Sequence, residues 1–274
     1  MRCFVLFVLV TVAATAFAHP GSGIAVAADG RVFFIDTGRG IFVIERDGSV
    51  TRLDAPAHHW FAFDAAKRFE GTRFPNIPGA DIRSAGPLIL SSDYPVVVGQ
   101  DGAFYYPQFS DRLRLIRMTP DGASSVYATL PGSHHWVNGL AAAGDGALYY
   151  AEDNAVRKID RRGVISTVAD NISVAQCASI PGSDRPPYLR GLAIAPDGTI
   201  YVAASACVAL LKIARGRVEP FLRISAPWSP TAVAVHDGEI YVLEYLHTAS
   251  ENRREWIPRV RKIGRDGKQV MLTK

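Results

Sequence analysis

Residues 140–152 read LAAAGDGALYYAE, and this pattern recurs four more times in the chain, at 24–36, 96–108, 192–204 and 232–244. Each copy has an apolar segment, an Asp-Gly pair and a second apolar segment. The spacings between successive turn aspartates are 72, 44, 52 and 40 residues, for Asp29, Asp101, Asp145, Asp197 and Asp237. The first gap is about twice the others, which predicts a further repeat hidden inside it.

One full repeat, residues 139–168, predicts four antiparallel strands. Asp145-Gly146 fits a tight hairpin between the first two strands, because glycine tolerates the positive φ of such turns. The alternating segment 156–159 predicts a half-exposed third strand, and Arg162-Gly163 predicts the second hairpin. The Asp-Gly pairs are therefore expected to be structural.

The hidden repeat is expected at residues 58–91 and is the least regular. Ala65-Ala66 stands where the first hairpin would place Asp-Gly, and residues 88–92 (LILSS) fit a last strand. With this unit included, six repeats begin near residues 21, 58, 93, 136, 188 and 229.

A four-stranded sheet of this size cannot bury both of its faces alone, whereas repetition around a central axis covers the faces and protects the edges. We therefore predict an all-β, six-bladed β-propeller with four antiparallel strands per blade, occupying residues 19–274 as a single domain. Both terminal blades look complete, so nothing in the sequence suggests that the ring closes by strand exchange.

The strand–Asp-Gly–strand repeats, most typically SPTAVAVHDGEIYVLEY at 229–245, resemble NHL-repeat propellers and the six-bladed senescence marker protein and gluconolactonase group. The resemblance extends over nearly all of residues 19–274 and is specific for the fold. It implies several activities, since this group includes sugar-lactone hydrolases, streptogramin lyases and propellers that only bind partners.

The N-terminus predicts export. An apolar run at 3–18 follows Arg2 and ends in Ala16-Phe17-Ala18, as a signal peptide cleaved after Ala18 would. A retained anchor is the alternative, but the run is short. We expect a secreted or periplasmic monomer with no membrane span after cleavage.

Two cysteines remain after cleavage, Cys177 and Cys207, and an even pair in an exported protein suggests a disulfide. Both are expected at the same end of the ring; two buried thiols are the alternative. The net charge of +4 is mild and no basic stripe is present, so we expect no nucleic-acid partner.

In such propellers, ligands bind where the innermost strands begin, near the central funnel. Counting back from each first hairpin places six residues there: Ser22, His59, Tyr94, Asn138, Arg190 and Pro230. A second ring comes from the ends of the second strands: Asp36, Gln108, Glu152, Ala204 and Glu244. The many polar members predict a polar funnel.

His-His-Trp occurs at 58–60 and at 134–136, and His247 lies in a loop of the last blade. His59, His135 and His247 come from alternate blades and could hold zinc with an open position for water, while mixed ligation that includes Asn138 and Glu152 would suit calcium or magnesium. The alternative is that these histidines cap strands and pack between blades.

The lactonase group binds its divalent metal through one Glu, two Asn and one Asp at the funnel. Asn138, in Val-Asn-Gly-Leu, matches one Asn, but Ser22, Tyr94 and Arg190 occupy the other columns. One match in four argues against a lactonase metal site in this chain.

A binding role requires fewer coincidences. Aromatic rings beside positive donors suit sugars, carboxylates or peptide segments, and the candidates are Trp60, Tyr94, Trp136, Arg190, Arg253, Arg254 and Trp256. The long loop at 245–258 could act as a lid, or Trp256 could instead pack onto the last blade. The leading hypothesis is thus a propeller that binds a small-molecule or protein ligand. The alternative is a metal-dependent lactone hydrolase or lyase, gluconolactonase-like or streptogramin-lyase-like.

Overall fold

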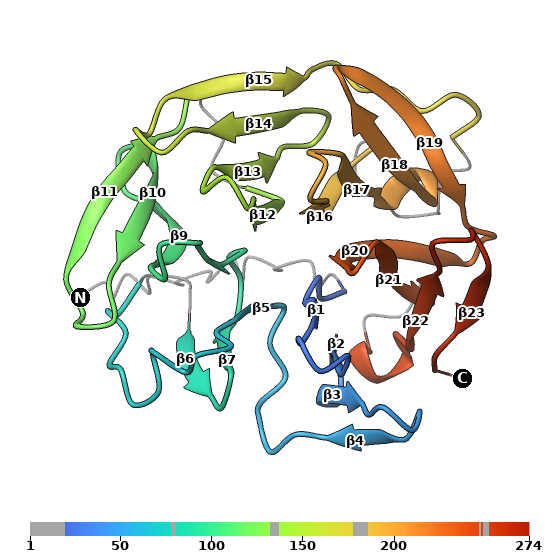
Figure 1. Cartoon of the computed structure of the whole chain (residues 1–274), viewed down its shortest axis with the longest axis horizontal. Helices are drawn as coiled ribbons and strands as arrows, with labels where there is room; N and C mark the ends of the chain where they lie inside the picture. The colour runs from blue at the N-terminus through green and yellow to red at the C-terminus, as the bar shows by residue number, and fades with distance from the viewer. Residues whose placement is uncertain are drawn as a thin grey trace, which may run out of the picture.

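A computed structural model of the chain describes residues 20–77, 81–131, 137–177, 186–246, 248 and 252–273. Six antiparallel sheets form a ring around a central axis (Figure 1), which confirms the predicted all-β, six-bladed propeller. Five sheets have the predicted four strands, and the second sheet has three among the residues described. The proposed signal peptide, residues 1–18, lies outside these residues. No helix in the described part is long and apolar enough to cross a membrane.

Each blade is built from one contiguous stretch of chain. The strands of the first three blades are β1 (Ile24–Val26), β2 (Val32–Asp36), β3 (Gly40–Ile44) and β4 (Val50–Arg52); β5 (Trp60–Phe63), β6 (Ile82–Ala85) and β7 (Leu88–Ser91); and β8 (Val97–Val98), β9 (Phe104–Phe109), β10 (Leu113–Met118) and β11 (Ser124–Thr129).

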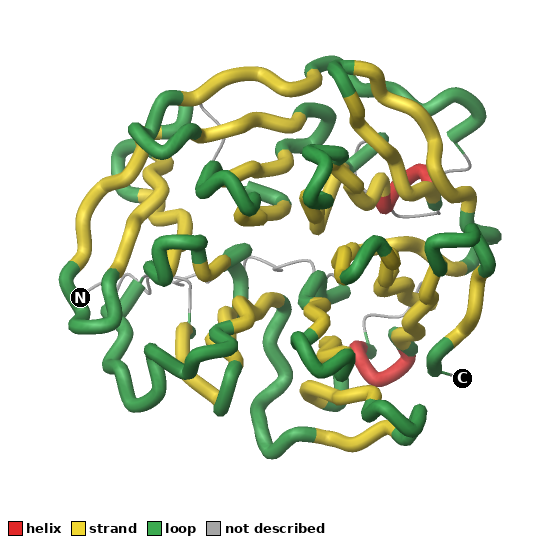
Figure 2. Tube along the Cα trace, viewed as in Figure 1, coloured by secondary structure: helices red, strands yellow, loops and turns green. Residues whose placement is uncertain are grey.

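The last three blades follow the same plan. Their strands are β12 (Gly139–Ala142), β13 (Leu148–Ala151), β14 (Val156–Ile159) and β15 (Ile165–Ala169); β16 (Leu189–Ile194), β17 (Ile200–Ala204), β18 (Ala209–Ala214) and β19 (Arg217–Arg223); and β20 (Trp228–His236), β21 (Glu239–Leu246), β22 (Pro258–Ile263) and β23 (Gln269–Met271). Two short 3-10 turns, η1 (Ser205–Cys207) and η2 (Arg253–Glu255), interrupt the loops (Figure 2).

The Asp-Gly turns have the conformation that the sequence predicts. Gly146, for example, has a φ of +80°, and the Asp145 carboxylate accepts a hydrogen bond of 2.9 Å from Ala147 N. Asp197 makes the same contact with Thr199 N at 2.9 Å. These turns share one end of the ring with the second hairpins, and we call it the hairpin end. The inner strands begin at the opposite end, which we call the entry end.

The second blade differs from the prediction. β5 pairs directly with β7, Trp60 opposite Ser91 and Phe63 opposite Leu88, so no hairpin forms at Ala65-Ala66. The segment at 88–92 therefore supplies a central strand rather than the last one. The chain leaves the sheet after β5, where the Asp64 carboxylate accepts a hydrogen bond of 2.9 Å from Phe69 N and Phe69 is fully buried against the third blade. Residues 64–77 therefore form a loop held by Asp64 and Phe69, and they do not form the hairpin that the sequence predicts.

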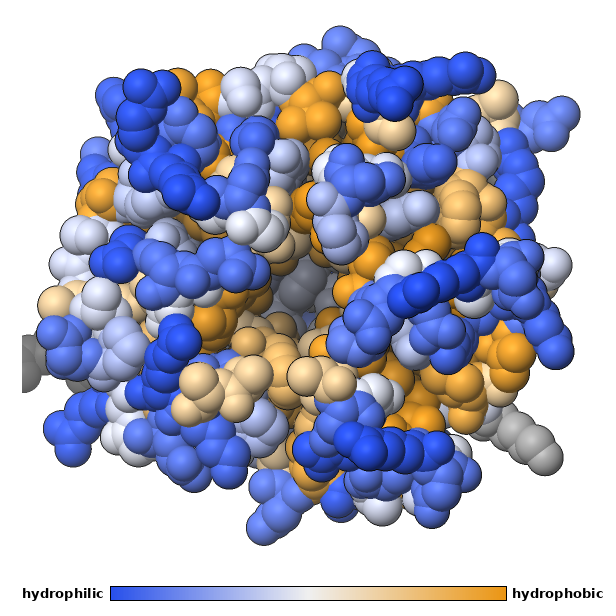
Figure 3. All heavy atoms as spheres, in the orientation of Figure 1, coloured by the Kyte–Doolittle hydropathy of each residue, from blue (hydrophilic) through white to orange (hydrophobic). Residues whose placement is uncertain are grey.

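The core consists of clusters between neighbouring blades, because alternate side chains of each strand face opposite sides of its sheet. In β2, Phe33 and Ile35 pack toward the second blade, while Val32 and Phe34 pack toward the sixth. The first and last blades thus meet directly, and β1 lies beside β20 (Figure 1). One face of the ring is hollowed at its centre, with hydrophilic side chains spread over its outer part (Figure 3).

Candidate functional site

Polar side chains are buried at the entry end on several blades. Four that the funnel prediction names are each at least nine-tenths buried, namely Ser22, His59, Tyr94 and Arg190. A buried polar group destabilises the fold unless it has a hydrogen-bond partner. The ability of these side chains to bind a ligand therefore depends on the hydrogen bonds that they already make within the protein.

Arg190 spans three blades. Although it belongs to the fifth blade, its Nη2 donates a hydrogen bond of 2.6 Å to the carbonyl of Pro20, which leads into the first blade. The sixth blade lies between them, and Thr231 of β20 is close enough that a Cβ on Gly191 would stand 3.0 Å from its carbonyl. The guanidinium of Arg190 thus crosses the entry of the sixth blade.

Two hydroxyls in this region are buried without a hydrogen-bond partner among the described residues. They are Ser22 Oγ, two residues after Pro20, and Thr231 Oγ1. The backbone N–H of Ser22 donates to the carbonyl of His59 at 2.7 Å, so the first two blades are joined here. The two hydroxyls thus keep a hydrogen-bonding capacity that no described residue uses.

Two histidines of the second blade stand near carboxylates. His58 Nε2 is 3.6 Å from Asp81 Oδ2, and His59 Nδ1 is 3.8 Å from Asp93 Oδ1. His58 Nδ1 lies 2.9 Å from the Ala57 carbonyl, which favours the tautomer with its proton on Nδ1. Burial lowers the pKa of His58, while the Ala57 carbonyl and Asp81 oppose the shift.

The other predicted metal ligands already have protein partners. Asn138 Nδ2 donates a hydrogen bond of 2.9 Å to Asp153 Oδ1, and Glu152 pairs with Arg157 at 3.1 Å. Within the described ranges, no group of three or more His, Cys, Asp and Glu side chains could hold a metal ion. His135 and His247 lie outside those ranges, so the proposed tri-histidine site is not described.

The acidic residues that end the second strands of the first and last blades are also occupied. Glu244 is fully buried and accepts hydrogen bonds of 2.6 Å from both Arg259 Nε and Arg261 Nε. Asp36 is held by Arg39 at 3.1 Å. The guanidinium of Arg259 also lies 3.8 Å above the ring of Trp228. These carboxylates form ion pairs within their own blades, which leaves them poorly suited to bind a metal.

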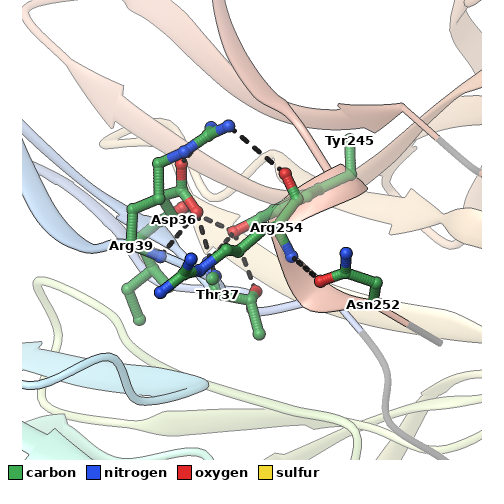
Figure 4. Close-up of polar contacts among 8 residues, drawn as sticks. Asp36, Thr37, Arg39, Tyr245, Asn252 and Arg254 are labelled. Carbon is green, nitrogen blue, oxygen red and sulfur yellow. Dashed lines mark hydrogen bonds and ion pairs between the residues drawn. The ribbon is translucent and has the colours of Figure 1, made fainter.

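A polar network joins the first and last blades at the entry end (Figure 4). Arg39, bound to Asp36, donates through Nη2 to the carbonyl of Arg254 at 3.2 Å. The backbone N–H of Arg254 donates to Asn252 Oδ1 at 3.2 Å. This network closes the ring through side chains and loops rather than through a shared strand.

The aromatic residues expected to contact a ligand mostly pack inside the protein. Trp60 and Tyr94 are buried in the cluster between the second and third blades, and Trp256 is buried between the sixth and first. Arg254 is exposed. Trp136 and the side chain of Arg253 lie outside what the structure describes. Arg190, which the sequence also predicts to bind a ligand, contacts Pro20, two residues before Ser22.

The predicted disulfide is confirmed. Cys177 and Cys207 are joined with an S–S distance of 2.03 Å, and Cys207 belongs to η1 in the fifth blade. The bond ties the segment before the fifth blade to a loop of that blade.

Sequence reasoning missed a repeated cluster at the hairpin end. Four residues after a turn aspartate stands a tyrosine, and a basic residue faces it across the next strand pair. The pairs are Tyr105 with Arg117, Tyr149 with Lys158, Tyr201 with Lys212, and Tyr241 with Lys262. The constant spacing from the Asp-Gly turn was a visible signal, because strand alternation places all four tyrosines in the same orientation.

Comparisons with known proteins identify the fold. No protein-family model and no curated protein matches the chain. A catalytically inactive virginiamycin B lyase variant from Staphylococcus aureus, solved with quinupristin, has a TM-score of 0.55 at 17% identity, over 94% of this chain and 85% of that one.

Two further solved structures are similar. Regucalcin from Agrobacterium tumefaciens, described as a calcium-binding protein, has a TM-score of 0.53 at 12% identity, over 81% of each chain. A luciferin-regenerating enzyme has a TM-score of 0.54 at 15% identity, over 88% of this chain and 91% of that one. These similarities confirm the expected resemblance at the level of the six-bladed fold.

Proposed function

We propose that this propeller binds a small polar ligand at the entry end of its channel, between the fifth, sixth and first blades. The observation that carries the proposal is the pair of buried hydroxyls without described partners, Ser22 Oγ and Thr231 Oγ1, at the end of the ring where Arg190 binds the Pro20 carbonyl. A ligand with hydroxyl or carboxylate groups would supply the missing hydrogen bonds to the two hydroxyls.

The test uses substitutions that keep side-chain shape. Ser22→Ala and Thr231→Val remove hydroxyls that have no partner in the described residues, so we expect the unliganded protein to keep its stability. Sugars, sugar lactones and hydroxy acids would be screened by the shift in the melting temperature of the mature protein. A compound that stabilises the wild type should bind the double variant about tenfold more weakly, which corresponds to the loss of one or two hydrogen bonds.

Thr199→Val is the matched control. Its hydroxyl donates to Asp197 at 3.0 Å at the hairpin end, so this variant should bind the compound as the wild type does. If every compound class leaves the melting temperature unchanged, or if the double variant binds as tightly as the wild type, the proposal fails.

A second candidate, a hydrolase or lyase, is supported by the placement of His59 near Asp93 at 3.8 Å. An imidazole oriented by a carboxylate can act as a general base. The lyase neighbour solved with quinupristin is an inactive histidine-to-alanine variant, which shows that a propeller of this fold can depend on a histidine. Turnover of a lactone or a cyclic depsipeptide that is lost in His59→Gln but kept in His236→Gln would favour this candidate.

The described donors do not form a metal site, since Asn138, Glu152, Asp36 and Glu244 have protein partners. We therefore derive no step that uses a metal. Elemental analysis of the purified mature protein tests metal dependence directly. A stoichiometric metal that is lost in His59→Ala and in His135→Ala would favour a metal-dependent enzyme over a binding protein.

A further inference from the structure

A cavity opens at the hairpin end, between the third and fourth blades. Its volume is about 390 Å³, and its lining includes Asp101, Tyr105, Arg117, Tyr127, Gly146 and Arg161. Asp101 and Gly146 belong to first-hairpin turns and Arg161 to a second hairpin, so the cavity lies at the opposite end of the ring from the entry end. Cavities of this size hold small molecules.

Two tyrosine rings form the aromatic part of the cavity lining. The rings of Tyr105 and Tyr127 meet edge to face, with centroids 5.0 Å apart and an interplanar angle of 74°. Their hydroxyls are committed to the protein, since Tyr105 donates to Asp101 Oδ2 at 3.0 Å and Tyr127 donates to the Asp160 carbonyl at 2.8 Å. The rings are therefore held in place, and they can offer carbon surface to a ligand.

Most charges around the cavity are already paired. Arg117 Nε donates to Asp101 Oδ2 at 2.8 Å, and Lys158 pairs with Asp145 at 3.1 Å. Burial alone would raise the pKa of Asp101, but hydrogen bonds from Ala103 N, Arg117 and Tyr105 hold the pKa below its usual value. Asp101 therefore stays ionised and neutralises Arg117.

Arg161 is the remaining cation of the lining. Its Nε donates to the Asp145 carbonyl at 2.5 Å, and the guanidinium lies against Gly146, where a Cβ would stand 2.7 Å from Nε. The same contact recurs in the sixth blade, where Arg265 donates to the Asp237 carbonyl. This arginine-to-turn hydrogen bond is therefore a repeated feature of the blades. The terminal nitrogens of Arg161 have no hydrogen-bond partner among the residues described. The hydrogen bond through Nε thus orients the guanidinium of Arg161, while its terminal N–H groups remain able to donate hydrogen bonds.

We propose that this cavity binds a small aromatic carboxylate, with the aromatic ring against Tyr105 and Tyr127 and the carboxylate on the terminal nitrogens of Arg161. A guanidinium edge presents two parallel N–H donors, which match the two oxygens of a carboxylate. A single unpaired cation favours a monoanion over a dianion. This site is independent of the one proposed at the entry end.

The test uses 4-fluorobenzoate as the probe, followed by fluorine NMR during titration of the mature protein. We expect binding about tenfold tighter than that of the neutral 4-fluorobenzamide, because a hydrogen bond between charged groups is about twice as strong as a neutral one. Arg161→Gln should reduce the affinity for the acid about tenfold and leave the amide unaffected. Equal binding of acid and amide, or no binding of either, would overturn the proposal.

Arg162→Gln is the matched control, because Arg162 is the next residue, pairs with Asp160 at 3.3 Å and has a side chain that is 83% exposed. It should bind 4-fluorobenzoate as the wild type does. A loss equal to that of Arg161→Gln would mean that general surface charge, rather than this cavity, attracts the probe.

Tyr127→Phe and Tyr127→Leu test the aromatic wall in case Arg161→Gln perturbs the hairpin. The first keeps the ring and should keep binding, whereas the second removes the ring and should weaken binding several-fold. Equal affinities in the two variants would contradict the proposed role of the ring.

Discussion

The hydroxyl of Tyr245, in the last blade, donates a hydrogen bond of 2.5 Å to the carbonyl of Ile35, in the first blade. The same hydroxyl accepts a hydrogen bond of 3.1 Å from Thr37 Oγ1, and Thr37 Oγ1 in turn accepts one of 2.7 Å from Gly21 N. Tyr245 is fully buried, and burial raises the pKa of its phenol, so the hydroxyl keeps its proton. One side chain thereby fastens the seam between the two ends of the described chain.

Tyr245→Phe should lower the free energy of unfolding by about 1–3 kcal/mol, because the Ile35 carbonyl and Thr37 lose a buried partner. Tyr241→Phe is the control, since its hydroxyl bonds within one blade to Glu239 at 2.8 Å, in a partly buried position. Urea denaturation followed by tryptophan fluorescence measures both variants. Equal decreases in the free energy of unfolding for the two variants would show that the hydrogen bond between the last and first blades stabilises the protein no more than one within a blade.

Glu244→Gln should destabilise the protein by about 3 kcal/mol, because Arg259 and Arg261 would keep their charges without the carboxylate between them. Glu152→Gln removes a carboxylate with a similar pairing to Arg157, but its side chain is 19% exposed, and we expect a loss of about 1 kcal/mol. The same denaturation experiment compares them. A Glu244 variant as stable as the wild type would contradict the assignment of this residue to a structural ion pair.

Reduction of Cys177–Cys207 should destabilise the protein by about 3–4 kcal/mol, as expected for a bond between residues 30 positions apart. Melting curves with and without dithiothreitol measure the effect. The variant with both Cys177→Ala and Cys207→Ala should melt at the temperature of the reduced wild type and should not respond to dithiothreitol. A response to the reductant in that variant would point to another cause.

His58 should make stability depend on pH. Burial holds its pKa in the folded state below the usual value of 6.5, so the unfolded chain takes up a proton first as the pH falls. The free energy of unfolding should therefore decrease as the pH drops below 6.5, and His58→Gln should flatten that decrease. Denaturation midpoints across this range give the measurement, and an unchanged slope in the variant would contradict the expected shift.

The sequence predicts the regular blades well because each Asp-Gly turn carries its own local signal. Gly146 and Gly198 both need the positive φ that they have, and their aspartates bond to the backbone two residues on. The second blade lacks this local signal. There, β5 pairs with β7, and the chain between them buries Phe69 against the third blade, a tertiary contact that no turn motif encodes.

The sequence predicts which end of the ring the candidate residues occupy, but it does not predict which partners their side chains contact. Counting from the turns correctly brings Ser22 and Arg190 to the entry end, since the register of a strand fixes which end a residue occupies. Burial of Trp256 and the pairing of Glu244 with two arginines depend instead on how neighbouring elements pack. The facing of Glu244 and Arg259 on adjacent strands offered a partial signal.

Every blade is a contiguous stretch, and the seam between the sixth and first blades is closed by side chains such as Tyr245 and Arg39. The packing at that seam is therefore like the packing between the other neighbouring blades. The difference is that the other five pairs of neighbouring blades are also joined by a covalent linker, such as the one between β4 and β5. A circular permutant that joins residues 20 and 273 through a short linker and opens between β4 and β5 should form the same ring. In such a permutant, the order of the blades in space should stay the same although the chain starts at another blade.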